Sequence, residues 1–98
     1  MKNITDLEIQ AEKISEILKT IAHPKRLLIL CRLSSGPQTV TALVKSCHIS
    51  QSQLSQFLTK MREEGILTCE KSGLYVTYRI SNPEILQLLT SLSSIYCP

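Results

Sequence analysis

Residues 40–65, which read VTALVKSCHISQSQLSQFLTKMREEG, decide the fold. A short helix is predicted from Val40 to Cys47, and a second begins after Ser50, which forms a capping box with Gln53. The apolar residues of the second helix have the spacing of one buried face: Leu54, Phe57, Leu58 and Met61. Two helices joined by so short a link indicate a helix-turn-helix.

Two more helices are predicted upstream. Residues three or four apart form one apolar seam on the first: Ile4, Leu7, Ala11, Ile14, Leu18 and Ile21. His23-Pro24 ends it, because the residue before proline avoids helical conformations, and Pro24 begins a helix that runs to about Leu33. Residues 27–33 are apolar almost all round, which predicts a largely buried helix, and residues 34–37, SSGP, predict a turn.

Downstream of Gly65 the hydrophobic period changes from about 3.6 residues to 2. This predicts a hairpin of residues 66–70 and 74–80, with Lys71-Ser72-Gly73 at its tip, and a last helix from Asn82-Pro83 to about Ile95. The predicted fold is mainly α with a β-hairpin wing. It is a winged helix-turn-helix of order α-α-α-α-β-β-α, in a single domain of residues 1–98.

Composition and charge narrow the function. The net charge is +3, and residues 23–64 carry six basic and two acidic side chains, which favours an anionic partner over a merely solvated surface. No apolar run approaches the length of a membrane span, so we expect a cytoplasmic protein with no membrane partner. The chain has only three glycines and no glycine-rich phosphate loop, and it has no Ser, His and Asp set and no paired carboxylates in an apolar setting. We therefore expect no enzyme activity and no cofactor.

The outward side of the second helix of the helix-turn-helix carries amide, hydroxyl and basic side chains and no carboxylate: Gln51, Ser52, Gln53, Ser55, Gln56, Thr59, Lys60 and Arg62. Such groups read base edges and bind phosphates, which predicts that this helix enters the major groove of double-stranded DNA. Lys71 of the wing is a further phosphate ligand in this interpretation. The alternatives are a helix face that is only polar and a winged helix that binds proteins.

A homodimer is predicted through the helix from Leu7 to Ile21 and the last helix from Ile85 to Ile95, because each has an apolar seam. The seam of the last helix consists of Ile85, Leu88, Leu89, Leu92 and Ile95. Successive major grooves on one side of DNA lie about 34 Å apart, farther than one small domain reaches. We therefore expect the dimer to bind an inverted-repeat operator.

Three stretches resemble the ArsR/SmtB family of winged-helix repressors: residues 22–30 (AHPKRLLIL), 50–56 (SQSQLSQ) and 63–67 (EEGIL), together with YVTY at 75–78. Cys31 and Cys97 also resemble the paired cysteines of the family's thiol-switch subgroup. The resemblance implies a redox switch at Cys31 and Cys97, with reactive sulfur or an oxidant as the inducer that lowers DNA affinity. Cys47 and Cys69 are expected to be packing residues.

The family's metal sites are not expected here. Its thiol-rich motif falls on residues 41–45, TALVK, which have no Cys, Asp or His, and residues 84–96 offer only Glu84 as a ligand. Two alternatives remain open. One is a metal-responsive repressor that uses thiolates, and the other is a winged-helix regulator without an inducer that acts as an anti-silencer.

Overall fold

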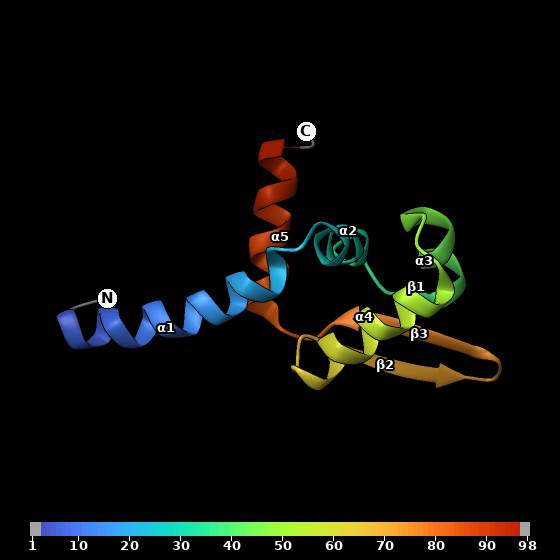
Figure 1. Ribbon diagram of the computed structural model, residues 1–98, viewed down its shortest axis with the longest axis horizontal. Coiled ribbons are helices and arrows are strands. Elements are labelled where there is room, and N and C mark those ends of the chain that lie inside the picture. Colours follow the sequence, from blue (N-terminus) through green and yellow to red (C-terminus); the bar gives the residue numbers. More distant parts are fainter. Residues whose placement is uncertain (1–2, 97–98) are drawn as a thin grey trace.

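The computed structural model describes residues 3–96, which form five helices and one three-stranded sheet (Figure 1). In chain order the elements are α1 (Ile4–Ile21), α2 (Pro24–Leu33), β1 (Gln38–Thr39), α3 (Val40–Cys47), α4 (Gln51–Glu63), β2 (Leu67–Ser72), β3 (Tyr75–Ile80) and α5 (Pro83–Tyr96). This arrangement confirms the predicted winged helix-turn-helix and adds one short strand, β1.

Local signals set the helix starts as predicted. α2 begins at Pro24, and Nδ1 of His23 accepts a hydrogen bond from the backbone N–H of Lys25 at 3.2 Å. At α4, Oγ of Ser50 accepts from the backbone N–H of Gln53 at 3.2 Å. The side chain of Gln53 does not complete the capping box, because its Oε1 accepts from Nζ of Lys25 at 3.4 Å.

The core lies where α2 meets its neighbouring helices and the base of the sheet. The largest fully buried side chains are Ile29, Leu30, Leu33, Leu43, Leu54, Leu58, Met61, Leu67, Ile85 and Leu89. The prediction that Ile85 and Leu89 form part of the dimer seam is therefore wrong, because α5 buries them within its own chain. The prediction that α2 is a largely buried helix is confirmed at Ile29, Leu30 and Leu33, but Leu28 is 38% exposed. α1, α3, α5 and β3 pack against α2.

The sheet has the strand order β1-β3-β2, and both pairs are antiparallel. Lys71 pairs with Val76 inside the β2–β3 ladder, so its predicted place at the hairpin tip is wrong. The tip is Gly73, with a φ of 62°, and Leu74. β1 was not expected, because a strand of two residues exists only through its pairing with β3, which is distant in sequence.

α1 projects from the body of the molecule, away from the wing (Figure 1). The radius of gyration is 14.7 Å and the principal extents are 50 × 30 × 20 Å. A compact domain of about 100 residues has a radius of gyration of about 13 Å, so this chain is more elongated. Nearly all of α1 is exposed, including the apolar residues Ile4, Leu7 and Ile14 of its seam. Within residues 3–96, no helix combines the length and hydrophobicity needed to span a membrane.

Candidate nucleic-acid interface

The turn between α3 and α4 holds the two helices of the helix-turn-helix at a fixed angle. His48 ends α3 in the left-handed region, with a φ of 53° and a ψ of 42°. Ile49 follows it and is only 4% exposed, so its side chain anchors the turn in the core. The backbone reversal at His48 and the anchoring of Ile49 together turn the outer side of α4 toward solvent.

α4 has one buried and one open side. Leu54, Leu58 and Met61 are at most 1% exposed. All eight side chains predicted from the sequence to form its outward side are exposed, and we call them the polar face of α4: Gln51, Ser52, Gln53, Ser55, Gln56, Thr59, Lys60 and Arg62. Ser52, Gln56 and Thr59, spaced four and three residues apart, share the side of the helix opposite the core.

A shallow hollow of about 390 Å³ runs along this face, lined by Ser55, Gln56, Thr59, Lys60 and Glu63. Glu63 is the exposed carboxylate that ends the face. The two cations of the face, Lys60 and Arg62, lie in the last turn of α4 and attract an anionic partner there, whereas Glu63 repels it at the last residue.

Lys25 lies beside this face and sequence analysis missed it. Its Nζ donates to Oε1 of Gln53 at 3.4 Å, across 28 positions of sequence. The contact brings a cation from the start of α2 next to the first turn of α4. Lys25 is part of the stretch HPKR at residues 23–26, which is visible in the sequence, but the proximity of Lys25 to Gln53 depends on the tertiary fold.

Arg62 faces the wing. Its Nη1 donates to Sγ of Cys69 in β2 at 3.1 Å, and this hydrogen bond is the main cause that raises the pKa of Arg62 above its usual value. Tyr78 pairs with Cys69 across the ladder, and its burial raises the pKa of the phenol. Arg62 therefore stays a cation and joins the end of α4 to the base of the wing.

The wing stands beside the first turns of α4. Lys71 is exposed on β2, and at the tip Leu74 is 97% exposed and Tyr75 is 64% exposed. A cleft of about 350 Å³ separates the wing from α4 and is lined by Thr39, Thr41, Gln51, Ser55, Leu74 and Tyr75, among others. Leu74 was not predicted as a site residue, although an apolar side chain directly after a turn glycine is a readable signal of an exposed tip.

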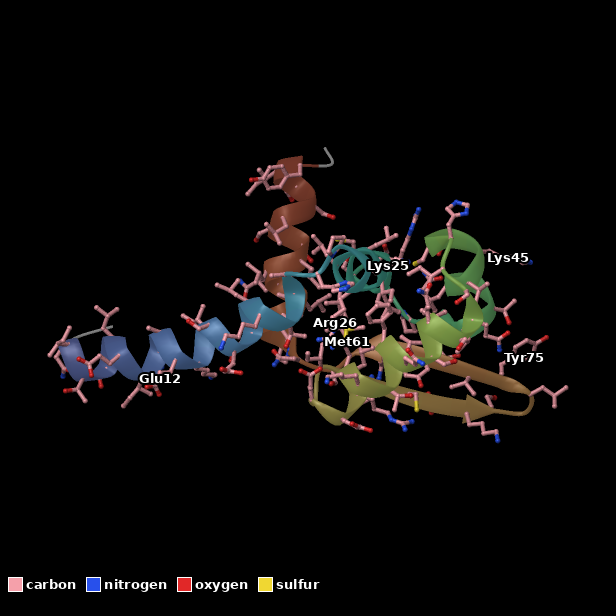
Figure 2. The ribbon with its side chains drawn as sticks, in the orientation of Figure 1. Glu12, Lys25, Arg26, Lys45, Met61 and Tyr75 are labelled. Carbon is pink, nitrogen blue, oxygen red and sulfur yellow. The ribbon has the colours of Figure 1, made fainter. Side chains whose placement is uncertain are left out.

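Charge is divided between the two ends of the molecule. Lys25 and Lys45 lie on the body of the domain, and Tyr75 marks the wing, whereas Glu12 lies on the projecting helix α1 (Figure 2). α1 contains four acidic and two basic side chains, whereas residues 23–62 contain six basic side chains and no acidic one. The positive potential is therefore concentrated around the helix-turn-helix.

The cysteines are distributed over the fold. Cys31 is half-buried near the end of α2, Cys47 is 3% exposed in the core and Cys69 is half-buried in β2. Cys97, the other predicted switch residue, lies outside the described residues. Within residues 3–96, no three His, Cys, Asp or Glu side chains gather closely enough to hold a metal ion.

Comparison with known proteins identifies the family. The model for bacterial regulatory proteins of the arsR family matches residues 23–68. The HTH-type transcriptional regulator YgaV of Escherichia coli is 36% identical over 99 residues, and the alignment covers all of both chains. The chain belongs to the ArsR family. It is also 35% identical to the biofilm growth-associated repressor of Xylella fastidiosa, over 94% of this chain and 81% of the repressor.

Solved structures of ArsR-family regulators have the same fold. HlyU from Vibrio vulnificus superimposes with a TM-score of 0.93 at 35% identity, covering 97% of this chain and 99% of HlyU. BigR from Xylella fastidiosa gives a TM-score of 0.88 at 33% identity and covers 98% of each chain. The resemblance seen in the sequence is thereby confirmed, and the protein is a DNA-binding transcriptional regulator rather than an enzyme.

Proposed function

We propose that this regulator represses transcription in the cytoplasm by binding an inverted-repeat operator as a homodimer, with α4 in the major groove. The observation that carries the proposal is the polar face of α4. It presents eight exposed donor-rich side chains without a carboxylate, on a helix whose other side is fixed in the core. Exposed amides and hydroxyls on a rigid helix suit the reading of base edges.

The polar face divides into two roles. Ser52, Gln53 and Gln56 are nearest the bases, and Thr59, Lys60 and Arg62 bind phosphates, together with Lys71 of the wing. Gln56 is the strongest candidate for base reading, because an unpaired Gln can bond adenine at two points. Gln51 and Ser55, which line the cleft toward the wing, complete the DNA-binding set.

The dimer is proposed to form through α1 and α5. The open seam of α1 consists of Ile4, Leu7, Ile14 and Leu18, which are 42–67% exposed, and α5 adds Leu86 and Ile95 at 37% and 66%. Contiguous apolar residues on a projecting helix favour association with another apolar surface. A second copy also supplies the second α4 that an inverted repeat requires.

The salt dependence of DNA binding tests the assignment. Three phosphate ligands per subunit, Lys60, Arg62 and Lys71, give about six contacts in a dimer and a slope of log K against log salt of about −5. Duplexes selected by the protein from a random-sequence pool serve as the probe, and an unselected duplex is the control. An affinity that does not change with salt would contradict the proposal and favour a winged helix that binds proteins.

We further propose that Cys31 and Cys97 are the sensing thiols. The proposal is supported by the resemblance to the thiol-switch subgroup and by similarity to reduced HlyU from Vibrio cholerae, at a TM-score of 0.91. With hydrogen peroxide, the two thiols lose two protons and two electrons to form one disulfide, and the peroxide becomes two waters. A persulfide donor R–SSH would instead transfer its outer sulfur to each thiol and leave as R–SH, and the two cysteine persulfides would then condense to a trisulfide bridge with release of hydrogen sulfide. Either product would tie the end of α5 to α2 and move the dimer helices.

Intact-protein mass spectrometry and gel shifts after hydrogen peroxide, diamide or a persulfide donor test the switch. Cys31→Ser and Cys97→Ser should each bind DNA in the presence of the inducer, whereas the Cys47→Ser, Cys69→Ser double variant should respond like the wild type. Loss of response in the double variant would overturn the assignment. Release of DNA by a metal ion instead, or by no inducer, would support the metal-responsive or the inducer-free alternative.

A further inference from the structure

The buried attachment of α1 to the domain lies at its end, and farther along the helix an exposed ion pair joins Nζ of Lys13 to Oε1 of Glu84 in α5 at 3.5 Å. Of its 18 residues, Thr20 and Ile21 are buried and Ile17 is half-buried, while the remainder is exposed. A long helix with so short a buried attachment acts as a lever, because an exposed ion pair such as that of Lys13 contributes little and the contacts at the base do most to set its direction. The contacts that fix this direction also fix where a partner bound to α1 lies.

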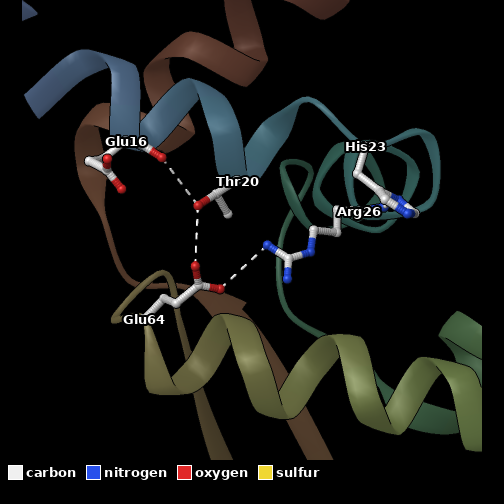
Figure 3. A network of polar contacts seen from close by, with 5 residues as sticks. All are labelled: Glu16, Thr20, His23, Arg26 and Glu64. Atoms are coloured by element: carbon white, nitrogen blue, oxygen red, sulfur yellow. Dashed lines mark hydrogen bonds and ion pairs between the residues drawn. The ribbon is translucent and has the colours of Figure 1, made fainter. Parts of the chain in front are cut away.

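The polar contacts at this base converge on Glu64, the residue that caps the end of α4 (Figure 3). Oε2 of Glu64 accepts a hydrogen bond from Oγ1 of Thr20 in α1 at 3.4 Å. Oε1 forms an ion pair with Nη1 of Arg26 in α2 at 3.4 Å, where the Arg26 side chain is only 14% exposed. One carboxylate therefore joins three helices.

Glu64 is firmly attached to α4. Its backbone N–H donates to the carbonyl of Lys60 at 3.0 Å, so its main chain continues the last turn of the helix. The hydroxyl of Thr20 also lies 3.3 Å from the carbonyl of Glu16, but it has one proton, and a carboxylate is the stronger acceptor. The geometry thus joins α1 to α4 directly, without passing through α2.

We propose that Glu64 is a positioning residue that fixes the direction of α1 relative to α4 and thereby sets the half-site spacing that the dimer accepts. The proposal rests on the proposed function, in which α1 pairs the two subunits and α4 reads DNA. It adds a residue outside the polar face that determines which operators are bound.

Packing alone does not hold α1 at this point. A cleft of about 300 Å³, lined by Ile17, Thr20 and Glu64 among others, lies between α1 and the corner where α4 passes into β2. The polar contact crosses a region that side chains leave unfilled. Both contacts of Glu64 are long and partly open to solvent, so their contribution to overall stability is small.

Small rotations of α1 have large consequences for operator choice. At 1.5 Å per residue, α1 is about 27 Å long, and a rotation of about 10° at its base moves its far end by about 5 Å. One base pair adds about 3.4 Å to the separation of two half-sites. Loss of the Glu64 contacts should therefore let the dimer accept spacings one or two base pairs from the optimum.

The test uses the full chain and an operator selected by the wild type, rebuilt with half-site spacings changed by one and two base pairs. The wild type should prefer the best spacing over the altered ones by at least about tenfold, since a shifted half-site loses its base contacts. Glu64→Ala and Thr20→Val should reduce that preference to about threefold or less. Binding to a single half-site should stay unchanged.

Glu63→Ala is the matched control, because it removes the same charge one residue away, where no contact to α1 exists. It should keep the wild-type spacing preference even if it binds all duplexes more tightly. Thr20→Val nearly preserves shape, so it keeps the test valid if Glu64→Ala unfolds.

The outcomes separate this inference from the function on which it rests. A wild-type preference retained in both Glu64→Ala and Thr20→Val would overturn the role of Glu64, as would a preference lost equally in Glu63→Ala. A wild-type protein that sediments as a monomer, or that binds all spacings equally, would overturn the dimeric function and the inference together.

Discussion

α4 and α1 are both amphipathic helices, yet only one of them has its apolar side covered within the chain. Leu54 and Leu58 of α4 are at most 1% exposed, whereas Leu7 and Leu18 of α1 are 44% and 48% exposed. The open sides differ as well, because that of α4 is polar and that of α1 includes apolar residues. The same helical periodicity therefore predicts an apolar face in both helices but does not tell which chain covers it.

The comparison implies two kinds of stability. The buried side of α4 stabilises the folded chain at any protein concentration, because its partners belong to the same chain. The open seam of α1 contributes only when a second surface is present, so its effect should depend on concentration.

The largest expected effect is that of Leu58→Ala, which removes a fully buried side chain from α4. It should lower the free energy of unfolding by about 2–5 kcal/mol, through lost burial and a residual cavity. Urea denaturation at low protein concentration measures this loss. Leu18→Ala is the control and should cost less than about 1 kcal/mol there. Equal losses for both variants would mean that α1 packs within its own chain.

Leu18→Glu and Leu92→Glu test whether the apolar seams of α1 and α5 form the dimer interface. Leu92 is half-buried on α5 and belongs to the seam predicted for that helix. A charge in the seam of either dimer helix should give folded monomers, because burying an unpaired carboxylate is unfavourable. Since linked half-sites gain about 100-fold or more in affinity, operator binding should fall by about that factor. Sedimentation measures the oligomeric state, and Leu74→Glu on the wing should remain dimeric. Variants of α1 and α5 that stay dimeric would show that the interface lies elsewhere.

The helix starts, which local sequence sets, were predicted correctly. Pro24 and Ser50 mark the starts of α2 and α4, because proline and capping residues act within one turn of the chain. The exposed polar face of α4 also followed from periodicity alone. The contribution of these residues to DNA binding stays a prediction.

The features that were missed depend on contacts distant in sequence. β1 exists because Gln38 pairs with Tyr78. The contact between Lys25 and Gln53 joins residues 28 positions apart, and the one between Thr20 and Glu64 joins residues 44 positions apart. No local pattern encodes such pairings, since each requires the relative placement of two helices. Lys71 was misplaced for a related reason, because strand pairing rather than composition determines where a hairpin turns.

Gln56→Ala tests whether the open side of α4 recognises the base sequence of DNA. The open side of α1, by contrast, is expected to bind a partner subunit. Gln56→Ala should reduce the preference for the selected operator over unselected DNA by about 1–3 kcal/mol, the value of one bidentate base contact. Lys71→Ala is the matched comparison and should weaken both duplexes alike, because phosphates carry no sequence information. Competition binding on the two duplexes separates the effects. If both variants lose affinity equally on specific and unselected DNA, α4 supplies charge and not readout, and another surface must select the operator.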